Sequence, residues 1–560
     1  MKNLQHKLKH HGRITYFKQK GDPYIFATGL GLVVALAMVV AMVAIILTKG
    51  LGFFWPRQLT QVTLKSGDTY LGEIWERDSR FERTGTGQEV KIKEIQLKIG
   101  NRDLYGQDFK WIDLPDVERR QQPPLATVIE RLEYGNFYGF IRAVHLEQTV
   151  VDSPQAALLQ AVRKGMAESR RIEARIKTLE HRLHDLTEPL SVLDQKIAQL
   201  EASGQKDAPA VARQLAHLQQ QADSLEAAIG ERYDRLEQQL GSLYQARDAH
   251  YLTMETADGQ QKDIPLYQIV RIFQPNRMTT VQKVQHYLAK LWEFVSANPR
   301  ESNTEGGVFP AIFGTVMMVL LMSIAVVPFG VLAAIYLNEY ARQGRIIRLI
   351  RLSVNNLAGV PSIVYGMFGL GFFVYLVGGS IDHLFFSNRL PEPTFGTGGI
   401  LWASLTLALL TLPVVVVATE EGLLAVPRAN KEGALALGAT RWQMIRKIAI
   451  PNAMPGILTG LILAISRGAG EVAPLMITGV VKLAPSLPLD TTFPFLHLDR
   501  KFMHLGFHIY DVGFQSPNVE AAKPMVYLTA LLLIAIVVCL NLLAIYLRNR
   551  LRKKYRSSAF

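Results

Sequence analysis

Cysteine is almost absent from this chain, whose 560 residues include only Cys539. A single cysteine cannot form an intrachain disulfide, so each part of the chain has to be stable without one. No Cys/His cluster has the spacing of a zinc site, and no Gly-x4-Gly-Lys-Ser/Thr loop for nucleotide phosphates occurs. We therefore expect no metal or other cofactor, and no ATP hydrolysis by this chain itself.

Acidic residues are outnumbered by basic ones, 48 Asp and Glu against 61 Lys and Arg, which gives a formal net charge of +13. Nucleic-acid binding is a poor explanation of this charge, because no basic stripe interleaved with aromatic residues and no DNA-binding motif accompanies it. Membrane topology explains the surplus better, as the distribution of the charges shows.

Long apolar runs are abundant, and six of them have about the length of a bilayer-spanning helix, roughly 20 residues. The first exceeds the apolar core of a typical signal peptide and lacks a clean small-residue cleavage site. The sequence thus predicts an α-helical polytopic membrane protein. The runs are residues 25–48, 309–337, 354–377, 398–419, 456–480 and 524–547.

The Lys and Arg residues are concentrated in three segments that lie on one side of the membrane if the six runs alternate in direction. By the positive-inside rule that side is the cytoplasm. We therefore predict a multi-pass protein of the bacterial inner (cytoplasmic) membrane with cytoplasmic N- and C-termini. The segments are residues 1–24, 342–351 and 548–560.

The 49–308 segment, between the first two runs, should be extracytoplasmic (periplasmic) and is too regular for a linker. Three stretches alternate apolar and polar residues, with a turn signal at Gly67 in the first and at Asp258-Gly259 in the last. These patterns predict strands, and hence an α+β domain inserted after the first span. The stretches are residues 61–75, 90–114 and 251–273.

A helical insertion interrupts these strands at about 165–245. Its apolar residues step by four and three from Ile172 to Leu200 and again from Val211 to Leu243, which is a coiled-coil pattern. A short polar break between the halves predicts an antiparallel hairpin roughly 50 Å long, kinked at Pro189. Two roles stay open: a docking arm for an external partner, or a decoration packed on its own β base.

A spaced motif occupies the 420–451 loop between the fourth and fifth runs. Its small residues allow close approach to a partner, and its glycine can take a positive φ where the chain reverses. The motif consists of Glu432-Gly433-Ala434, three residues, Gly438, nine residues and Ile448-Ala449-Ile450-Pro451. An ordinary amphipathic loop would explain a shorter motif, but the full spacing resembles the coupling loop of ABC importer permeases. The resemblance implies contact with an ATP-hydrolysing subunit through Glu432, Gly433, Ala434, Gly438, Ala439 and Arg441.

Ionisable residues occur inside the fifth run, where Arg467 and Glu471 would share one face of a helix at i, i+4. Such residues are costly in a membrane and usually face a bundle interior or a pathway. Arg467 offers paired donors for a tetrahedral oxyanion, and Glu471 could hold it in place. The alternative is a structural ion pair that locks two helices together.

Three motifs together resemble the permease subunit of phosphate ABC importers, of the PstA type, over somewhat under half of the chain. The resemblance implies half of a translocation path, a second permease subunit, two ATP-binding subunits and a periplasmic phosphate-binding protein, within membrane lipid. Many relatives place an arginine before Thr-Thr-Glu in the fourth span, where this chain has Val417-Ala418-Thr419-Glu420. The motifs are residues 356–366 (NLAGVPSIVYG), 434–442 (ALALGATRW) and 467–474 (RGAGEVAP).

Other functions remain open at this stage. They are a permease for another oxyanion such as sulfate or molybdate, a non-transporting ABC-linked mechanotransmission protein, and a sensory scaffold that reports external phosphate. The predicted domain boundaries are a basic arm at 1–24, a first span at 25–48, the inserted domain at 49–308, the permease domain at 309–547 and a basic tail at 548–560.

A polar group precedes the last run and could be taken for a metal site. Its spacing matches no metal template, so we expect loop polarity or a contact surface for a solute-binding protein instead. The group consists of His497, Asp499, His504, His508 and Asp511.

Overall fold

The computed structural model describes residues 22–83, 89–147, 149–152, 155–202, 209–491, 493–516 and 519–556. Most of the predicted basic arm, the polar break at 203–208 and the last four residues of the tail lie outside these ranges.

Six helical segments of the described chain are long and apolar enough to cross a membrane, which confirms the predicted number. Two of them are single α-helices throughout, α11 (Ile400–Leu424) and α17 (Val519–Arg556). The other four are composite. The first is α2 (Asp22–Leu51) with its 3-10 end Gly52–Phe54, and the second is α7 (Phe309–Ile335) with its π-helical end Tyr336–Tyr340. The third is α9 (Ser362–Phe368) continued by η6 (Gly369–Gly378) and α10 (Gly379–Phe385), and the fifth is α13 (Arg441–Met444) continued by η8 (Ile445–Ala449) and α14 (Ile450–Gly468).

The predicted third span, residues 354–377, is wrong at its start. A separate amphipathic helix, α8 (Arg345–Leu357), ends before Pro361, and the spanning segment begins only at Ser362. Proline cannot continue the backbone hydrogen bonding and restricts the residue before it, so the helix breaks there. The prediction relied on hydrophobicity alone and therefore assigned the end of α8 to the span.

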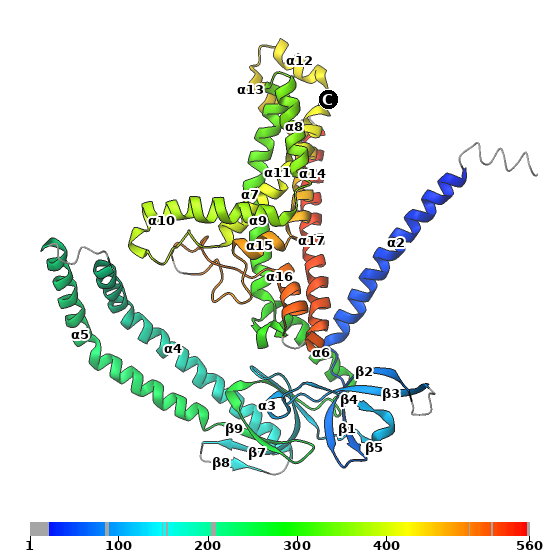
Figure 1. Ribbon diagram of the computed structural model, residues 1–560, viewed down its shortest axis with the longest axis vertical. Coiled ribbons are helices and arrows are strands. Elements are labelled where there is room, and N and C mark those ends of the chain that lie inside the picture. The colour runs from blue at the N-terminus through cyan, green and yellow to red at the C-terminus, as the bar shows by residue number, and fades with distance from the viewer. Residues whose placement is uncertain are drawn as a thin grey trace, which may run out of the picture.

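The centre of the bundle is α11, which packs against α7 and α14. A Cβ on Gly456 of α14 would lie 2.6 Å from the Cα of Gly422 on α11, so only glycine permits this approach. By contrast, α2 is exposed along most of its length and packs on α17. In Figure 1 the two helices meet at their lower ends, where Gly50 lies against Leu528.

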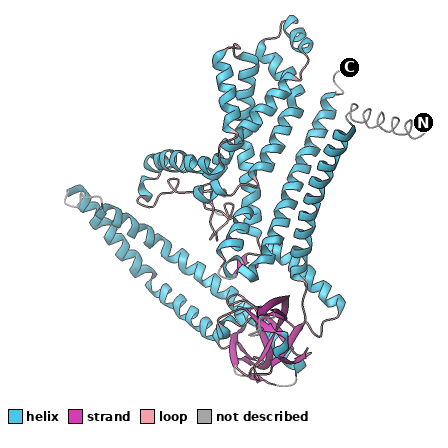
Figure 2. Cartoon of the chain, turned by 45° about the vertical axis from the view of Figure 1, so that its right-hand side comes forward, coloured by secondary structure: helices cyan, strands magenta, loops and turns pink. Residues whose placement is uncertain are grey.

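Eleven strands of the described chain form two antiparallel sheets below the bundle (Figure 2), and β12 (Pro299–Arg300) pairs with β13 (Glu305–Gly306) in a short separate ladder. The predicted hairpin turns at Gly67 and Gly259 are confirmed, since β1 pairs with β2 and β9 pairs with β10. The sequence analysis did not predict the four strands at residues 117–121, 127–131, 137–146 and 149–151. The first sheet has the order β4-β3-β2-β1-β5, from β1 (Leu59–Leu64), β2 (Thr69–Arg83), β3 (Glu89–Lys98), β4 (Phe109–Asp113) and β5 (Val117–Gln121). The second has the order β10-β9-β7-β6-β11 with β8 beside β7, from β6 (Thr127–Arg131), β7 (Phe137–Leu146), β8 (Thr149–Val151), β9 (Tyr251–Glu255), β10 (Gln261–Pro265) and β11 (Ile269–Phe273).

The predicted helical hairpin is confirmed as α4 (Gln155–Ala202) packed along α5 (Pro209–Asp248). Helix α4 begins ten residues earlier than the predicted boundary of 165 and runs through Pro189. Its first turns belong to the sheet core, because Leu158, Val162 and Met166 are buried among strand residues. Beyond Ile176 the hairpin leaves the sheets and extends to the side of the bundle (Figure 2).

Candidate functional site

The predicted coupling segment lies at the end of the bundle opposite the strands, the end at which α17 also finishes (Figure 1). It consists of α12 (Arg428–Ala436), a turn, and α13 (Arg441–Met444). Gly438 has a φ of 84°, and the N–H groups of Gly438 and Ala439 donate to the carbonyls of Leu435 and Ala434. This closes α12 with a left-handed residue, for which glycine has no steric cost.

The turn is rigid on both sides. Thr440 caps α13, since its hydroxyl accepts from the N–H of Gln443 while the Gln443 side chain accepts from the N–H of Thr440. On the other side, Lys431 of α12 forms a 2.6 Å ion pair with Glu339 at the end of the second span. The capping box and the ion pair therefore hold the loop in place on both sides of the turn and connect it to the bundle.

The predicted contact residues divide by exposure. Ala434 is buried in a cluster with Val426, Met444 and Ile445, so it holds the loop together. Glu432, Gly433, Gly438 and Arg441 are exposed, and Ala439 is half-buried.

Two apolar side chains at the same tip were missed by the sequence analysis. Leu437 is 91% exposed and Trp442 is 52% exposed. Apolar residues inside an otherwise polar loop were a readable signal, and these two side chains lie exposed beside the predicted contact residues.

The intramembrane pair differs from the sequence prediction in one respect. Helix α14 ends at Gly468, so Glu471 does not share a helical face with Arg467. A non-helical turn nevertheless brings the Glu471 carboxylate to 3.8 Å from Nε of Arg467. The side chains are 31% and 21% exposed, so the contact is long and only partly shielded.

Arg467 also approaches the turn between α8 and the third span, where its guanidinium lies 3.5 Å from the carbonyl of Ala358. Two of the motifs are adjacent here, since Gly366 packs directly on Pro474. Ala358 also lines a cavity of about 530 Å³ with Pro413, Val417, Ala418, Glu421 and other residues of α11 and its neighbours. The segment Val417-Ala418-Thr419-Glu420, in which this chain lacks the arginine of many relatives, thus contributes Val417 and Ala418 to the wall of this cavity.

The predicted polar group before the last span is mostly internal. His504, His508 and Asp511 are buried, so they cannot form a contact surface for another protein. Burial lowers the pKa of His504 and of His508 to about 4, which keeps both imidazoles neutral near pH 7. Among the described residues no group of three or more His, Cys, Asp or Glu side chains could hold a metal ion.

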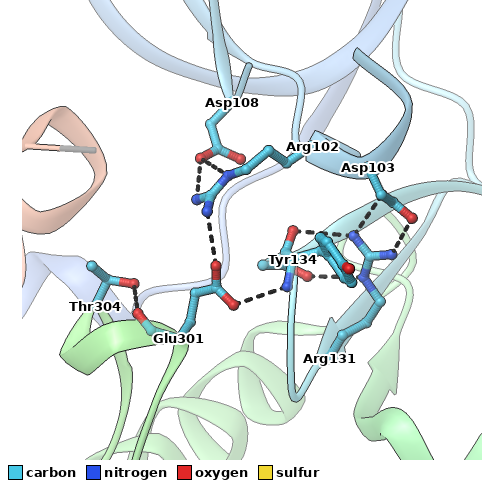
Figure 3. Close-up of polar contacts among 8 residues, drawn as sticks. Arg102, Asp103, Asp108, Arg131, Tyr134, Glu301 and Thr304 are labelled. Carbon is cyan, nitrogen blue, oxygen red and sulfur yellow. Dashed lines mark hydrogen bonds and ion pairs between the residues drawn. The ribbon is translucent and has the colours of Figure 1, made fainter. Parts of the chain in front are cut away.

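The strands are joined to the bundle through a strained turn that the sequence did not reveal. Glu301, Ser302 and Asn303 all have positive φ. Figure 3 shows the Glu301 carboxylate between Arg102, at 2.8 Å, and the N–H of Tyr134, at 2.9 Å. Two residues on, the Asn303 amide donates to Asp511 and to the carbonyl of Lys482 in the bundle. The turn therefore connects the sheets to the segment before the last span.

A neighbouring ion pair stabilises this turn on the side of the sheets. Arg131 binds both carboxylate oxygens of Asp103, at 2.9 and 3.0 Å (Figure 3). Burial alone would raise the pKa of Asp103, but the Arg131 guanidinium outweighs it, and the pKa lies below its ordinary value. The carboxylate is thus charged at neutral pH, and its ion pair with Arg131 is retained there.

Six spans, a capped loop at one end and a polar break in the fifth span define a membrane transport subunit. Residues 326–553 match the family model described as "Binding-protein-dependent transport system inner membrane component". The strands and the hairpin precede this matched region.

Sequence relatives identify the family more closely. The chain is 31% identical over 269 residues to a probable ABC transporter permease protein, YqgI, of Bacillus subtilis, a match that covers 47% of this chain and 85% of the relative. It is 35% identical to phosphate transport system permease protein PstA 1 of Mycobacterium tuberculosis, over 43% and 71% of the two chains. It is 34% identical to PstA of Yersinia pestis, over 45% and 75%. The chain belongs to the ABC transporter permease family and is of the PstA type, with a large additional domain.

Solved structures resemble the chain more distantly. A methionine ABC transporter in an inward-facing conformation is 18% identical and covers 47% of this chain and 97% of its own, with a TM-score of 0.29. A bacterial alginate ABC importer is 15% identical over 43% and 78%, with a TM-score of 0.31. The family assignment rests on the sequence relatives alone.

Proposed function

We propose that this chain is a transmembrane permease subunit of an ATP-driven importer of inorganic phosphate. It forms half of the translocation path and pairs with a second permease subunit. The PstA-type relatives, which are phosphate transport permeases by name, carry the choice of substrate. Arg467 supports this choice, because a guanidinium held loosely beside a carboxylate can donate to a tetrahedral oxyanion.

ATP hydrolysis is assigned to two partner subunits that dock on the 420–451 loop. The exposed Leu437 and Trp442 beside Glu432 and Arg441 provide an apolar anchor with a polar rim, as protein contacts usually have. The capped turn and the Lys431–Glu339 ion pair support a lever role for the loop. Closure of the ATPase dimer would then bias the bundle between outward and inward access.

The same proposal fixes the orientation in the bacterial inner membrane. The 420–451 loop and both termini face the cytoplasm, in agreement with the positive-inside distribution of Lys and Arg. The strands and the hairpin then lie in the periplasm, where a phosphate-binding protein would deliver its ligand.

Substrate competition tests the proposal in cells whose only phosphate permease contains this chain. Unlabelled phosphate should suppress uptake of radiolabelled phosphate, whereas sulfate and molybdate at the same concentration should not. Suppression by sulfate or molybdate would instead support a permease for another oxyanion. A lack of any uptake in cells with a normal amount of the complex would favour a mechanotransmission role.

Removal of the outer part of the hairpin should leave a permease that still inserts and binds its ATPase subunits. The excision should start after Glu180, because the earlier turns of α4, as far as the buried Ile176, lie at the sheet core. It should end before Tyr244, so that the hydrogen bond from the Tyr244 hydroxyl to Glu180 is kept, and a short Gly/Ser linker should close the gap. If the arm docks an external partner, phosphate uptake or its regulation by external phosphate weakens.

A half-length excision of about residues 190–230 is the matched control, since it removes the tip and keeps the lower half of the seam. An equal loss of phosphate uptake, or of its regulation, in both variants would assign docking to the tip. Wild-type uptake and regulation in both would contradict a docking arm, and loss of the protein from the membrane would show that the arm stabilises the domain.

A further inference from the structure

Helix α6 (Thr280–Ser296) is a feature that the transport function does not use. It follows the last strand and precedes α7, so it lies where the additional domain meets the bundle (Figure 1). Its first turn is closed by a capping box between Thr279 and Gln282. The helix is strongly amphipathic, and its position and contacts divide it into three faces.

One face is apolar and buried against the bundle. Phe294 packs on Phe54, with ring centroids 5.8 Å apart, in a cluster that includes Ala311 of α7 and Met525 of α17. Tyr287 lies beside Trp55, just beyond the end of α2. The helix is therefore held against the ends of three spanning helices.

A second face is charged and holds the sheets. Lys290 forms a 2.7 Å ion pair with Glu130 on β6. Glu293 pairs with Arg271 on β11 at 2.9 Å and with Arg300 at 2.7 Å. These contacts fix the rotation of the helix about its axis, and so determine which side chains are left outside.

The third face is apolar and has no covering within the described chain. Its residues are spaced by three, four and four, which places them on one side of a helix. The exposed fractions are 67% for Val281, 42% for Val284, 58% for Leu288 and 71% for Trp292. Gln282 and Ala289 are also exposed, but they lie on the adjoining side of the helix, whereas Gln285 lies four residues after Val281 and within the apolar face.

We propose that this third face lies in the outer interface of the lipid bilayer, so that α6 anchors the additional domain flat on the membrane. The third face of α6 continues the apolar surface of α2, which is exposed along its length. Helix α2 leads directly into the residues that pack on α6, so the two surfaces are adjacent. Spanning helices that end beside α6 bring it to the depth of the headgroups. Trp292, Trp55 and Tyr287 are the residue types that favour this depth, and the charged face is turned to the sheets, away from the hydrocarbon.

Spin labels on single cysteines test this placement in the full transporter, reconstituted in liposomes of phosphatidylethanolamine and phosphatidylglycerol. The one native cysteine is first removed by Cys539→Ala. Labels are then placed at Val284 and Leu288 and, as matched controls on the same helix, at Gln282 and Ala289. All four side chains are exposed, so labelling should not disturb packing.

Labels at Val284 and Leu288 should collide more often with dissolved oxygen, which concentrates in lipid, than with a water-soluble nickel chelate. Labels at Gln282 and Ala289 should give the reverse order. Equal access of nickel chelate to all four positions would overturn the proposal, because the face would then be in water. Immobilised labels at Val284 and Leu288 that neither reagent reaches would also overturn it, since a protein would then cover the face.

Discussion

Gly438→Asp is expected to abolish phosphate uptake while the protein still inserts and remains in the membrane at its normal level. The residue has a φ of 84°, so any side chain strains the turn, by about 1–3 kcal/mol for a non-glycine residue. No atom of the described chain lies within 4 Å of a Cβ at this position, so the new carboxylate projects outward. It would then enter the proposed groove of the ATPase subunit with a buried, unpaired charge, which is costly.

Two further variants separate the effect of backbone strain from the effect of the added charge. Gly438→Ala adds the strain without the charge and should reduce uptake less than Gly438→Asp. Gly67→Asp, in an open turn between β1 and β2 with a φ of 94°, adds the same strain and charge far from the loop and should leave uptake unchanged. Near wild-type uptake by Gly438→Asp, with normal expression, would show that the loop is not the coupling element.

Arg467→Gln should also abolish uptake, but without loss of assembly. Glutamine retains some hydrogen bonding and removes the charge that favours an anion in a low-dielectric path. The existing pair with Glu471 is long, at 3.8 Å, and partly exposed, so its loss should destabilise the complex little. Uptake of radiolabelled phosphate and the yield of detergent-solubilised complex are measured together.

The structural alternative for this pair gives a different pattern. If Arg467 only locks two helices, Arg467→Gln lowers the yield of complex and a second change, Glu471→Gln, partly restores it by removing the unpaired carboxylate. Arg467→Lys is the conservative control and should retain part of the uptake. Normal uptake by Arg467→Gln would exclude a role in the pathway.

Local patterns predicted those elements whose stabilising contacts are local. The heptad residues from Ile172 onward predicted the hairpin, and the glycines at 67 and 259 predicted two β-turns, because each pattern specifies its own partner. Proline explains one error, since Pro361 ends α8 in a stretch that hydrophobicity alone assigned to a span. The end of α14 at Gly468 explains a second error, the placing of Arg467 and Glu471 on one helical face, because an i, i+4 spacing has this effect only while the helix continues.

Contacts between distant segments could not be predicted in this way. The pairing of Glu301 with Arg102 joins residues 199 positions apart, and nothing near either residue indicates the other. The sheet contacts of Leu158 and Val162 likewise depend on how the strands fold around them. The apolar spacing in α6 was readable, but only the structure distinguishes its exposed residues from its buried ones.

Reconstitution tests the central claim most directly. Liposomes would contain this chain, its partner permease subunit and the two ATPase subunits, with the phosphate-binding protein supplied on the face that carries the strands. We predict that phosphate accumulates on the other side against its gradient only when ATP is present there, and that Arg467→Gln prevents this accumulation. ATP hydrolysis without any movement of phosphate, in a complex of normal composition, would contradict the account.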